Sequence, residues 1–280
     1  MENIRIEIDP IVEKDVLASA DPMANSTPPR IVFIVPDRDR EQQQQFFARQ
    51  MQYVLSDFPP DSYQIYYAHQ KDHRDFNRGA MRNIGFLAIK AKYPLHYKNI
   101  TFVFNDIDTM PYTKNFINYE TTHGTVKHPY GFNYTLGGIV SIKGGDFEKT
   151  NGYPNYWAWG YEDNLFQSRV LHNGLRIDRE VFYPVGSKDM IQLQDGATRV
   201  VKPNVFKHYI QNEPDGLDMI TDIEYTLCAE TGFIDITHFN VPSPNLPGLN
   251  KTHDLSQGKN PFNRRGATMG INWQRPKPAK

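Results

Sequence analysis

Short apolar runs in the first third of the chain predict the strands of a buried sheet. The clearest are residues 31–35, which read IVFIV, and residues 100–104, which read ITFVF. A third run, residues 63–68, reads YQIYYA and is rich in aromatic side chains. Continuous apolar runs of this length are typical of strands that are covered on both faces of a parallel sheet.

Amphipathic segments separate these runs and predict helices. Residues 41–58 carry apolar side chains at helical spacing, among them Phe47, Met51 and Val54, and residues 76–86 follow the same spacing. The resulting order, strand, helix, strand, helix, strand, predicts an α/β fold with a mostly parallel sheet flanked by helices. Ligands of such folds collect at the carboxyl ends of the strands, so we expect a site there.

The rest of the chain is predicted to complete one domain. Residues 139–142 read IVSI between two glycine pairs and predict another strand, and residues 217–240 alternate enough for one or two more. From residue 241 the chain is rich in proline, asparagine and glycine, which predicts a largely irregular tail. We therefore expect an N-terminal arm over residues 1–30, an α/β domain over residues 31–240 and a tail over residues 241–280.

Composition narrows the functional classes. The 280 residues carry a formal net charge of −1, so no basic excess indicates a nucleic acid as partner. The single cysteine, Cys228, excludes an intrachain disulfide and fits a reducing compartment. The N-terminal stretch lacks an apolar core long enough for a signal peptide or a membrane anchor. We expect a cytoplasmic protein without a membrane anchor.

Charged residues follow two of the predicted strands. The first strand ends in PDRDR, residues 36–40, and the third ends in NDID, residues 105–108. Two carboxylates one residue apart, Asp106 and Asp108, suit a hard divalent cation that binds phosphate oxygens at the same time. A DxD at the end of a buried strand therefore predicts a site for a metal and a diphosphate.

Arginine and aromatic side chains near these strand ends predict a nucleotide pocket. Guanidinium groups suit oxyanions, so Arg38, Arg40 and Arg78 are candidates for contacts to phosphate or uracil. Phe76 is a candidate for stacking on a base, and His208 could share the metal as a neutral imidazole. Taken singly, each of these residues has a simpler explanation: a surface arginine, a packed phenylalanine or a structural histidine.

The stretch from Tyr130 to Arg169 holds the densest group of aromatic and acidic side chains. Within it, residues 156–164 read YWAWGYEDN and open a predicted helix. Aromatic rings offer flat apolar faces with a polar edge. A carboxylate such as Glu162 or Asp163 accepts hydrogen bonds from hydroxyls, can act as a general base and is stabilised at a helix start. As a group, these residues predict a carbohydrate site rather than core packing.

Four sequence blocks, in this order, resemble the β-1,4-galactosyltransferase family with its β-1,4-N-acetylgalactosaminyltransferase and xylosylprotein galactosyltransferase relatives. They are PDRDR, FNRGAMRNIG, FVFNDIDTMPY and LGGIVSIKGGDFEKTNGYPNYWAWGYEDN, within a match over about residues 31–215. The resemblance implies a GT-A fold. It also implies an inverting transferase that depends on Mn²⁺ or another divalent cation and moves a hexose from a UDP-sugar donor to a glycan or glycoconjugate acceptor.

The resemblance implies a role for each matched residue. Asp108 would bind the metal, with His208 as its second ligand. Asp163 would be the catalytic base, and Glu162 would meet the acceptor sugar beside it. Thr135 falls where the animal galactosyltransferases carry a bulky tyrosine, so we expect the site to accept UDP-GalNAc as well as UDP-Gal. The donor and its nucleotide would be bound by Pro36, Arg38, Arg40, Phe76, Arg78, Asp106, Gly138 and the mobile-loop tryptophan, Trp159.

Two other functions stay open from the residues alone. A glycoside hydrolase also uses paired carboxylates, although it needs no DxD at a strand end beside arginines. A sugar- or nucleotide-binding protein on an inactive transferase scaffold would keep the pocket without turnover, and the retained acids argue against it. The chain also departs from the family before His208, where Val205 and Phe206 replace a methionine or a second histidine. Without the anchor and disulfides of the animal enzymes, a viral or microbial source is the expectation.

Overall fold

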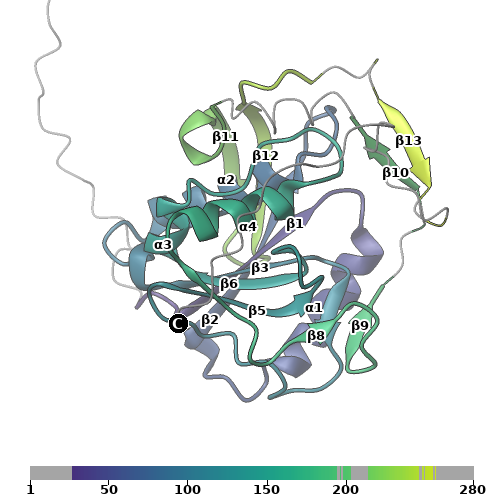
Figure 1. The fold of residues 1–280 in the computed structure, drawn as a ribbon. Coiled ribbons are helices and arrows are strands. Elements are labelled where there is room, and N and C mark those ends of the chain that lie inside the picture. The colour runs from purple at the N-terminus through teal and green to yellow at the C-terminus, as the bar shows by residue number, and fades with distance from the viewer. Residues whose placement is uncertain are drawn as a thin grey trace, which may run out of the picture.

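The computed structural model describes residues 27–193, 196, 198–202, 214–245, 248, 250–254 and 256 (Figure 1). The expected arm over residues 1–30 lies outside these residues except at its end, and so does the last part of the expected tail. None of the described helices combines the length and the apolar character needed to cross a lipid bilayer.

The elements alternate between strands and helices in the first half of the chain. The helices are α1 (Glu41–Val54), α2 (Arg78–Lys92), α3 (Gly144–Lys149) and α4 (Glu162–His172). The strands are β1 (Ile31–Asp37), β2 (Tyr63–Gln70), β3 (Thr101–Asn105), β4 (Thr109–Pro111), β5 (Thr125–Gly131), β6 (Ile139–Lys143), β7 (Arg176–Asp178), β8 (Tyr183–Pro184), β9 (Met190–Gln192), β10 (Thr198–Val201), β11 (Thr221–Leu227), β12 (Phe233–Asn240) and β13 (Lys251–Asp254).

A nine-stranded mixed sheet forms the centre of the fold. Its order is β11-β12-β2-β1-β3-β6-β5-β7, with β8 paired to β5. Strands β12, β2, β1 and β3 are parallel to one another, whereas β6 is antiparallel to both β3 and β5. The three apolar runs of the sequence are strands β1, β2 and β3, so the predicted α/β class with a mostly parallel sheet is confirmed.

Side chains of β1 alternate between the two faces of the sheet and join two separate cores. Phe33 and Val35 belong to the core that includes Phe47 of α1, whereas Val32 and Ile34 belong to the core that includes residues of α2. All these side chains are fully buried. The helices therefore cover opposite faces of the sheet, as right-handed crossovers between parallel strands predict.

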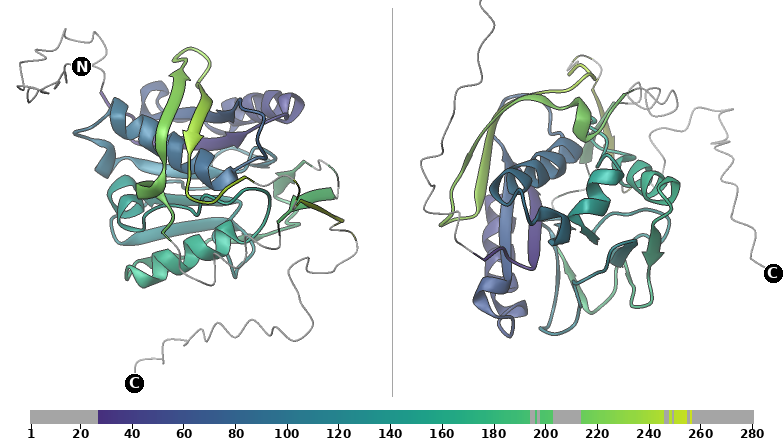
Figure 2. Two further views of the ribbon diagram at one scale, coloured as in Figure 1. Left: turned by 90° about the horizontal axis from the view of Figure 1, so that it is seen from above. Right: turned by 90° about the vertical axis from the view of Figure 1, so that its left-hand side faces the viewer.

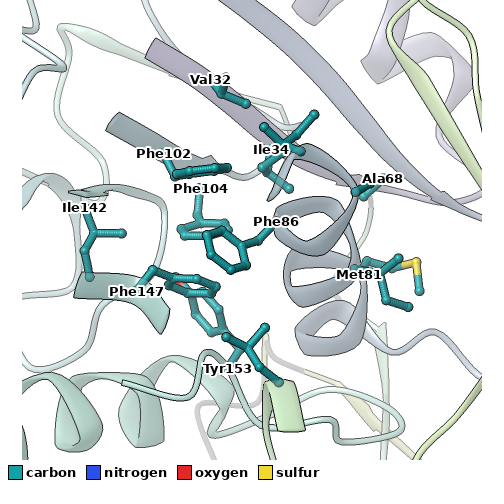
Figure 3. Close-up of a cluster of buried hydrophobic side chains, with 14 of the residues drawn as sticks. Val32, Ile34, Ala68, Met81, Phe86, Phe102, Phe104, Ile142, Phe147 and Tyr153 are labelled. Atoms are coloured by element: carbon teal, nitrogen blue, oxygen red, sulfur yellow. The ribbon is translucent and has the colours of Figure 1, made fainter. Parts of the chain in front are cut away.

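An aromatic cluster joins α2 to the sheet and to α3 (Figure 3). The ring centroid of Phe86 lies 4.9 Å from that of Phe102 and 4.8 Å from that of Phe147. Tyr153 extends the cluster, with its ring centroid 5.3 Å from that of Phe104. Because interiors of this kind are close-packed, the position of α2 relative to the sheet is fixed.

Two glycines allow α2 to approach its neighbours closely. A Cβ at Gly85 would lie 2.6 Å from Cγ2 of Ile34 on β1, and a Cβ at Gly79 would lie 1.8 Å from the carbonyl oxygen of Pro154. Any larger residue at these positions would force the helix away from the sheet or from the loop after α3. The first turn of α2 is thereby held against the region where the predicted site residues lie.

Two additions lie at the periphery of the fold. The hairpin of β11 and β12 extends the sheet beyond β2 and confirms the strands expected within residues 217–240 (Figure 2). Strands β10 and β13 form a separate antiparallel ribbon (Figure 1). The sequence predicts a largely irregular tail from residue 241, and β13 adds a strand to it. Its residues, KTHD, pair through their backbones and have no apolar alternation, so the pattern gave no signal.

Candidate active site

The predicted nucleotide residues line one small pocket at the carboxyl ends of β1 and β3. Its lining residues are Pro36, Arg38, Arg40, Phe76, Arg78, Asp106 and Ile107. All of them except Ile107 were expected to bind the donor. The fold thus brings together three segments that are far apart in the sequence, and we call their site the strand-end pocket.

The start of α2 fixes two side chains of the strand-end pocket. Asn77 caps this helix, because its side chain accepts a hydrogen bond from the Ala80 N–H and donates one to the Asn155 carbonyl. Phe76 and Arg78 flank the cap, so their directions follow from where the helix begins. A cap of this type contributes about 0.5–2 kcal/mol to stability.

Asp106 and Asp108 lie in the turn that follows β3. Asn105, the last residue of the strand, is buried and donates from Nδ2 to two carbonyls of this turn, each at 2.8 Å. The turn directs both carboxylates towards arginines. Asp108 Oδ2 lies 3.2 Å from Arg40 Nη1, and Asp106 Oδ1 lies 4.0 Å from Arg78 Nη1.

The two acids of this turn have pKa values displaced in opposite directions. Burial raises the pKa of Asp108, and the charge of Asp106 raises it further, against Arg78 and Arg40. Burial also acts to raise the pKa of Asp106, but Arg82 and Arg78 outweigh it, so the pKa of Asp106 is lowered. A cation bound between such acids would relieve their repulsion and favour the ionised form of both.

The acidic pair fits a hard divalent cation such as Mn²⁺. Carboxylate oxygens are the ligands that such a cation prefers, and it takes further oxygens from phosphates. Within the described residues no cluster of three or more Asp, Glu, His and Cys side chains could complete a metal site. The predicted second ligand, His208, lies outside the described residues. A cation that is shared with a bound diphosphate would take further ligands from phosphate oxygens.

Glu162 and Asp163 are the first two residues of α4. Glu162 is 4% exposed, and its Oε2 accepts a hydrogen bond from the backbone N–H two residues before it, at 3.0 Å. Asp163 is 25% exposed in its side chain and lies against Gly137, where a Cβ would be 2.2 Å from Asp163 Oδ2. Gly138 has a φ of +79° and accepts a hydrogen bond from Asp106 N–H at 3.0 Å. Gly137 therefore leaves room for the carboxylate of Asp163, and the carbonyl of Gly138 fixes the backbone of Asp106.

Arg82, which the sequence analysis did not select, joins the two acidic parts of the site. Its Nη1 donates to Asp163 Oδ1 at 2.7 Å, and its Nη2 donates to Asp106 Oδ1 at 2.8 Å. The side chain is 1% exposed, and its Cζ lies 4.5 Å from the centroid of the Tyr153 ring. The signal that could have revealed it is its spacing, because Arg82 follows Arg78 by four residues and shares its helix face.

Asp163 has a pKa that suits a general base. Burial raises the pKa of this carboxyl to about 6, against the charge of Arg82 and with the help of Glu162 and Asp106. A base with such a pKa is mostly ionised at neutral pH and can still take a proton from a hydroxyl in a transition state.

Two tryptophans near this helix have different surroundings. Trp157 is 2% exposed, its ring stacks on Phe239 at a centroid distance of 5.5 Å, and its Nε1 donates to the Ser243 carbonyl at 2.6 Å. Trp159 is half-buried, and its backbone N–H donates to the Val200 carbonyl of β10 at 2.9 Å. Trp157 is therefore a packing residue, while Trp159 keeps surface that a ligand could contact.

The backbone around Trp159 is irregular. We call residues 156–161 the tryptophan segment. Within it Ala158, Gly160 and Tyr161 have φ angles of 75°, 131° and 66°. Positive φ at a residue other than glycine costs on the order of 1–3 kcal/mol. Ala158 N–H donates to the Phe76 carbonyl at 3.1 Å, which ties the segment to the strand-end pocket.

The predicted donor-specificity residue, Thr135, is buried close to the predicted base. It is 6% exposed, and the next residue, Leu136, donates from its N–H to the Asp163 carbonyl at 3.2 Å. Arg179 donates from Nη2 to the Thr135 carbonyl at 3.0 Å and from Nε to Nδ1 of His128 at 2.8 Å. Burial lowers the pKa of His128 to about 4, so its neutral ring can accept this bond. Sequence reasoning did not select His128 or Arg179, which act only through tertiary contacts.

Two family models match adjoining parts of the chain. The model described as the N-terminal region of glycosyl transferase group 7 matches residues 6–120. The model described as the N-terminal domain of galactosyltransferase matches residues 120–191. Together they include every site residue predicted from the sequence except His208.

Curated relatives of the chain are animal β-1,4-galactosyltransferases. It is 30% identical over 185 residues to human β-1,4-galactosyltransferase 7, a match that covers 61% of this chain and 53% of that protein. It is 27% identical over 172 residues to bovine β-1,4-galactosyltransferase 1, covering 56% of this chain and 40% of that protein. The chain thus spans about half the length of the curated relatives it matches.

Solved structures of a related fly protein share the fold. The catalytic domain of Drosophila β1,4-galactosyltransferase 7 in complex with xylobiose matches with a TM-score of 0.57 at 19% identity, over 77% of this chain and 95% of that one. A mutant of the fly protein in complex with manganese, UDP-Gal and xylobiose matches with the same TM-score at 20% identity. The predicted GT-A fold is confirmed.

Proposed function

The chain belongs to the galactosyltransferase family of glycosyl transferase group 7, and from this premise we propose that it is an inverting, metal-dependent glycosyltransferase. Its donor is a UDP-sugar that carries galactose or N-acetylgalactosamine, and its acceptor is a hydroxyl of a sugar or glycoconjugate. The manganese, UDP-Gal and xylobiose bound to the fly protein support this choice of metal, donor and acceptor class.

The observation that carries the proposal is the convergence of two functional parts on Arg82. The strand-end pocket contributes Asp106, and the start of α4 contributes Asp163, and one guanidinium bonds to both. A donor bound in the pocket and an acceptor hydroxyl at Asp163 would therefore lie side by side. Direct displacement requires this placement, and holding two reactants in it supplies a large part of the rate enhancement.

The pocket residues bind and orient the donor. Phe76 stacks on the uracil ring, and Arg38, Arg40 and Arg78 provide positive charge for the nucleotide and its diphosphate. A divalent cation held by Asp108 and His208 would act there as a Lewis acid that stabilises charge on the diphosphate.

Proton transfer takes place where the acceptor binds, at Asp163. Asp163 takes the proton from the acceptor hydroxyl, whose oxygen attacks the anomeric carbon from the face opposite UDP, so the configuration at that carbon inverts. Glu162 meets the acceptor sugar beside Asp163. Closure of the tryptophan segment, with Trp159 over the donor, excludes water and limits hydrolysis of the donor.

The size of Thr135 broadens the choice of donor. A threonine side chain occupies less volume than the tyrosine that the animal enzymes carry at the matching position, which leaves room for an N-acetyl group. Tyr134 and Leu136 are the side chains that could fill this space instead. Tyr134 is 61% exposed and stacks on Phe132, whereas Leu136 is fully buried. Removal of a steric block widens specificity before it creates a new preference.

The direct test is a turnover assay with UDP-Gal and UDP-GalNAc in the presence of Mn²⁺, measuring UDP release with and without simple sugar acceptors. We expect release to rise severalfold when a suitable acceptor is present. Glycoside hydrolysis without nucleotide sugar or metal would establish a hydrolase instead. Binding of UDP without turnover on any acceptor would establish a binding protein on this scaffold.

The cytoplasmic location stays a prediction. It is supported by the single cysteine, which fits folding in a reducing compartment. Expression in a reducing and in an oxidising compartment, with recovery of folded protein as the readout, tests it: we expect equal recovery in both.

A further inference from the structure

Arg82 is the most deeply buried charged side chain of the site. Its side chain is 1% exposed, whereas those of Asp106 and Asp163 are 20% and 25% exposed. Tyr153 supports the guanidinium from one side, and Tyr153 itself stacks on Phe166 of α4 at a centroid distance of 4.1 Å. Because solvent and ligands reach the two acids but not Arg82, this arginine acts through them and not on a substrate directly.

The two carboxylate oxygens of Asp163 have different surroundings, because Arg82 bonds one of them. Oδ1 accepts the hydrogen bond from Nη1 at 2.7 Å. Oδ2 lies against the Cα of Gly137, and no described residue donates a hydrogen bond to it. An ionised carboxylate has lone pairs on both oxygens, so Oδ2 remains able to accept a proton. One oxygen is thus fixed by the protein while the other is available to an acceptor hydroxyl.

The same guanidinium fixes the distance between the donor side and the base. Its two terminal nitrogens are planar and rigidly spaced, and each bonds a different carboxylate. Its hydrogen bonds to described residues go to these two acids, and its Nε has no acceptor within the described part of the chain. A lysine would supply the positive charge but not two rigidly spaced nitrogens that bond two carboxylates at once.

We propose that Arg82 is the positioning residue of the site, which holds Asp106 and Asp163 in register so that Oδ2 of Asp163 faces the acceptor hydroxyl beside the bound donor. This inference rests on the proposed transferase function. Packing alone does not require it, because a leucine or methionine would fill a buried position on α2 at lower cost than a charge that must be desolvated. The arginine keeps its place because both of its partners are at the site.

The test compares Arg82→Lys and Arg82→Met with Arg169→Met as a matched control. Arg169 is also largely buried and forked, but it bonds Asp215 and the carbonyls of Asn151 and Gly152, away from both acids. Each variant is assayed for kcat, for KM of donor and acceptor, and for thermal unfolding. A small displacement of reacting groups typically costs about 10²-fold in rate. We expect kcat to fall by about that factor in Arg82→Lys and further in Arg82→Met, with the donor KM nearly unchanged.

A second readout does not depend on turnover. The carboxyl of Asp163 can be followed by ¹³C NMR in metal-free protein labelled at aspartate, with Asp163→Asn to assign its signal. The charge of Arg82 lowers the pKa of this group, so Arg82→Met should move its titration to higher pH, while Arg169→Met should leave it in place.

The outcomes separate the two claims. If the wild type turns over no sugar but the Asp163 titration responds to Arg82→Met alone, the transferase function fails, while the contact of Arg82 with Asp163 stands without a role in transfer. If the wild type is active and Arg82→Met lowers Tm as Arg169→Met does, with kcat and the Asp163 titration unchanged, Arg82 is a structural residue and the inference is overturned. Loss of folding in Arg82→Met leaves Arg82→Lys, where unchanged kcat with intact Tm would also overturn it.

Discussion

The strand-end pocket and the tryptophan segment border each other but are built in different ways. Pro36 lies in β1, Asp106 directly follows β3, and Phe76 lies two residues before α2. The pairing of β1 with β2 and β3 fixes the backbone at these strand ends. The tryptophan segment belongs to no helix or strand and has left-handed backbone at Ala158 and Tyr161. Backbone hydrogen bonds tie it to Phe76, to Val200 and to Leu165 of α4, and the side chain of Trp157 anchors it to Phe239 and Ser243.

This difference separates two kinds of function within one site. A part built on strand ends can be complete before a ligand arrives, as binding of a nucleotide and a metal requires. The stretch around Trp159 belongs to no helix or strand and keeps exposed surface, so it can change position more readily than the strand ends, as closure over a substrate requires. Substitutions in the strand-end pocket should therefore act on binding, and those near α4 and in the tryptophan segment should act on turnover.

Removal of metal gives the largest expected effect, because it disables the strand-end pocket as a whole. Turnover should be abolished by excess chelator and restored by added Mn²⁺. Thermal unfolding in the same buffers is the control, and it should show a folded protein throughout. Undiminished turnover in excess chelator would remove the metal from the account.

Asp163→Asn tests whether this carboxylate is the general base of the reaction. The amide keeps the shape of the side chain but cannot take a proton, and loss of a general base typically costs about 10²–10⁴-fold in rate. We expect kcat to fall by that amount. Asp146→Asn is the control, because Asp146 is a buried acid that bonds Gly124 and Lys149 outside the site, and turnover should survive its loss. Near wild-type kcat in Asp163→Asn would exclude this residue as the base.

The two tryptophans of the tryptophan segment are expected to differ in function, one in stability and the other in turnover. Trp157→Ala should lower the free energy of unfolding by about 3–5 kcal/mol, because it leaves a cavity between Phe239 and Arg74. Trp159→Ala should leave thermal stability nearly unchanged and lower kcat about 10²-fold through poorer closure. Equal losses of stability in both variants would show that Trp159 is a packing residue too.

The pH dependence of turnover should report the pKa of Asp163. The pKa of Asp163 is raised to about 6, and the carboxyl must be ionised to accept a proton. The rate should therefore be constant above neutral pH and fall about tenfold per pH unit below pH 6. A profile of kcat against pH checks this, and residual activity of Asp163→Asn should lack this acidic limb.

Donor choice is expected to change least. Thr135→Tyr should lower kcat/KM for UDP-GalNAc more than for UDP-Gal, because it places a bulky ring in the space for the N-acetyl group. One methylene of misfit between substrate and pocket typically changes kcat/KM by about 10–200-fold, and we expect the donor ratio to change by a similar factor. Thr135→Val, which keeps the volume, is the matched control. If the wild type rejects UDP-GalNAc and Thr135→Tyr leaves the donor ratio unchanged, this position does not set specificity.

The sequence predicts the strand-end pocket better than its surroundings, and the reason is physical. Apolar runs mark β1 and β3, and the charged residues at their ends must share one edge of the sheet. The spacing of Arg82 from Arg78 indicates a shared helix face but not the two acids that Arg82 bonds, and a histidine in a strand, such as His128, carries no local signal of its partners. The polar strand β13 and the left-handed residues of the tryptophan segment likewise depend on tertiary contacts. His208 stays a prediction.

The central claim is that the strand-end pocket binds the nucleotide independently of the catalytic residues near α4. Calorimetric titration of UDP, with and without Mn²⁺, tests this claim most directly. Wild type and Asp163→Asn should bind UDP alike in the presence of Mn²⁺, because the strand-end pocket is intact in both. Asp108→Ala should lose the Mn²⁺-dependent part of the affinity. Loss of UDP binding in Asp163→Asn, or equal binding by all three proteins with and without Mn²⁺, would contradict the account.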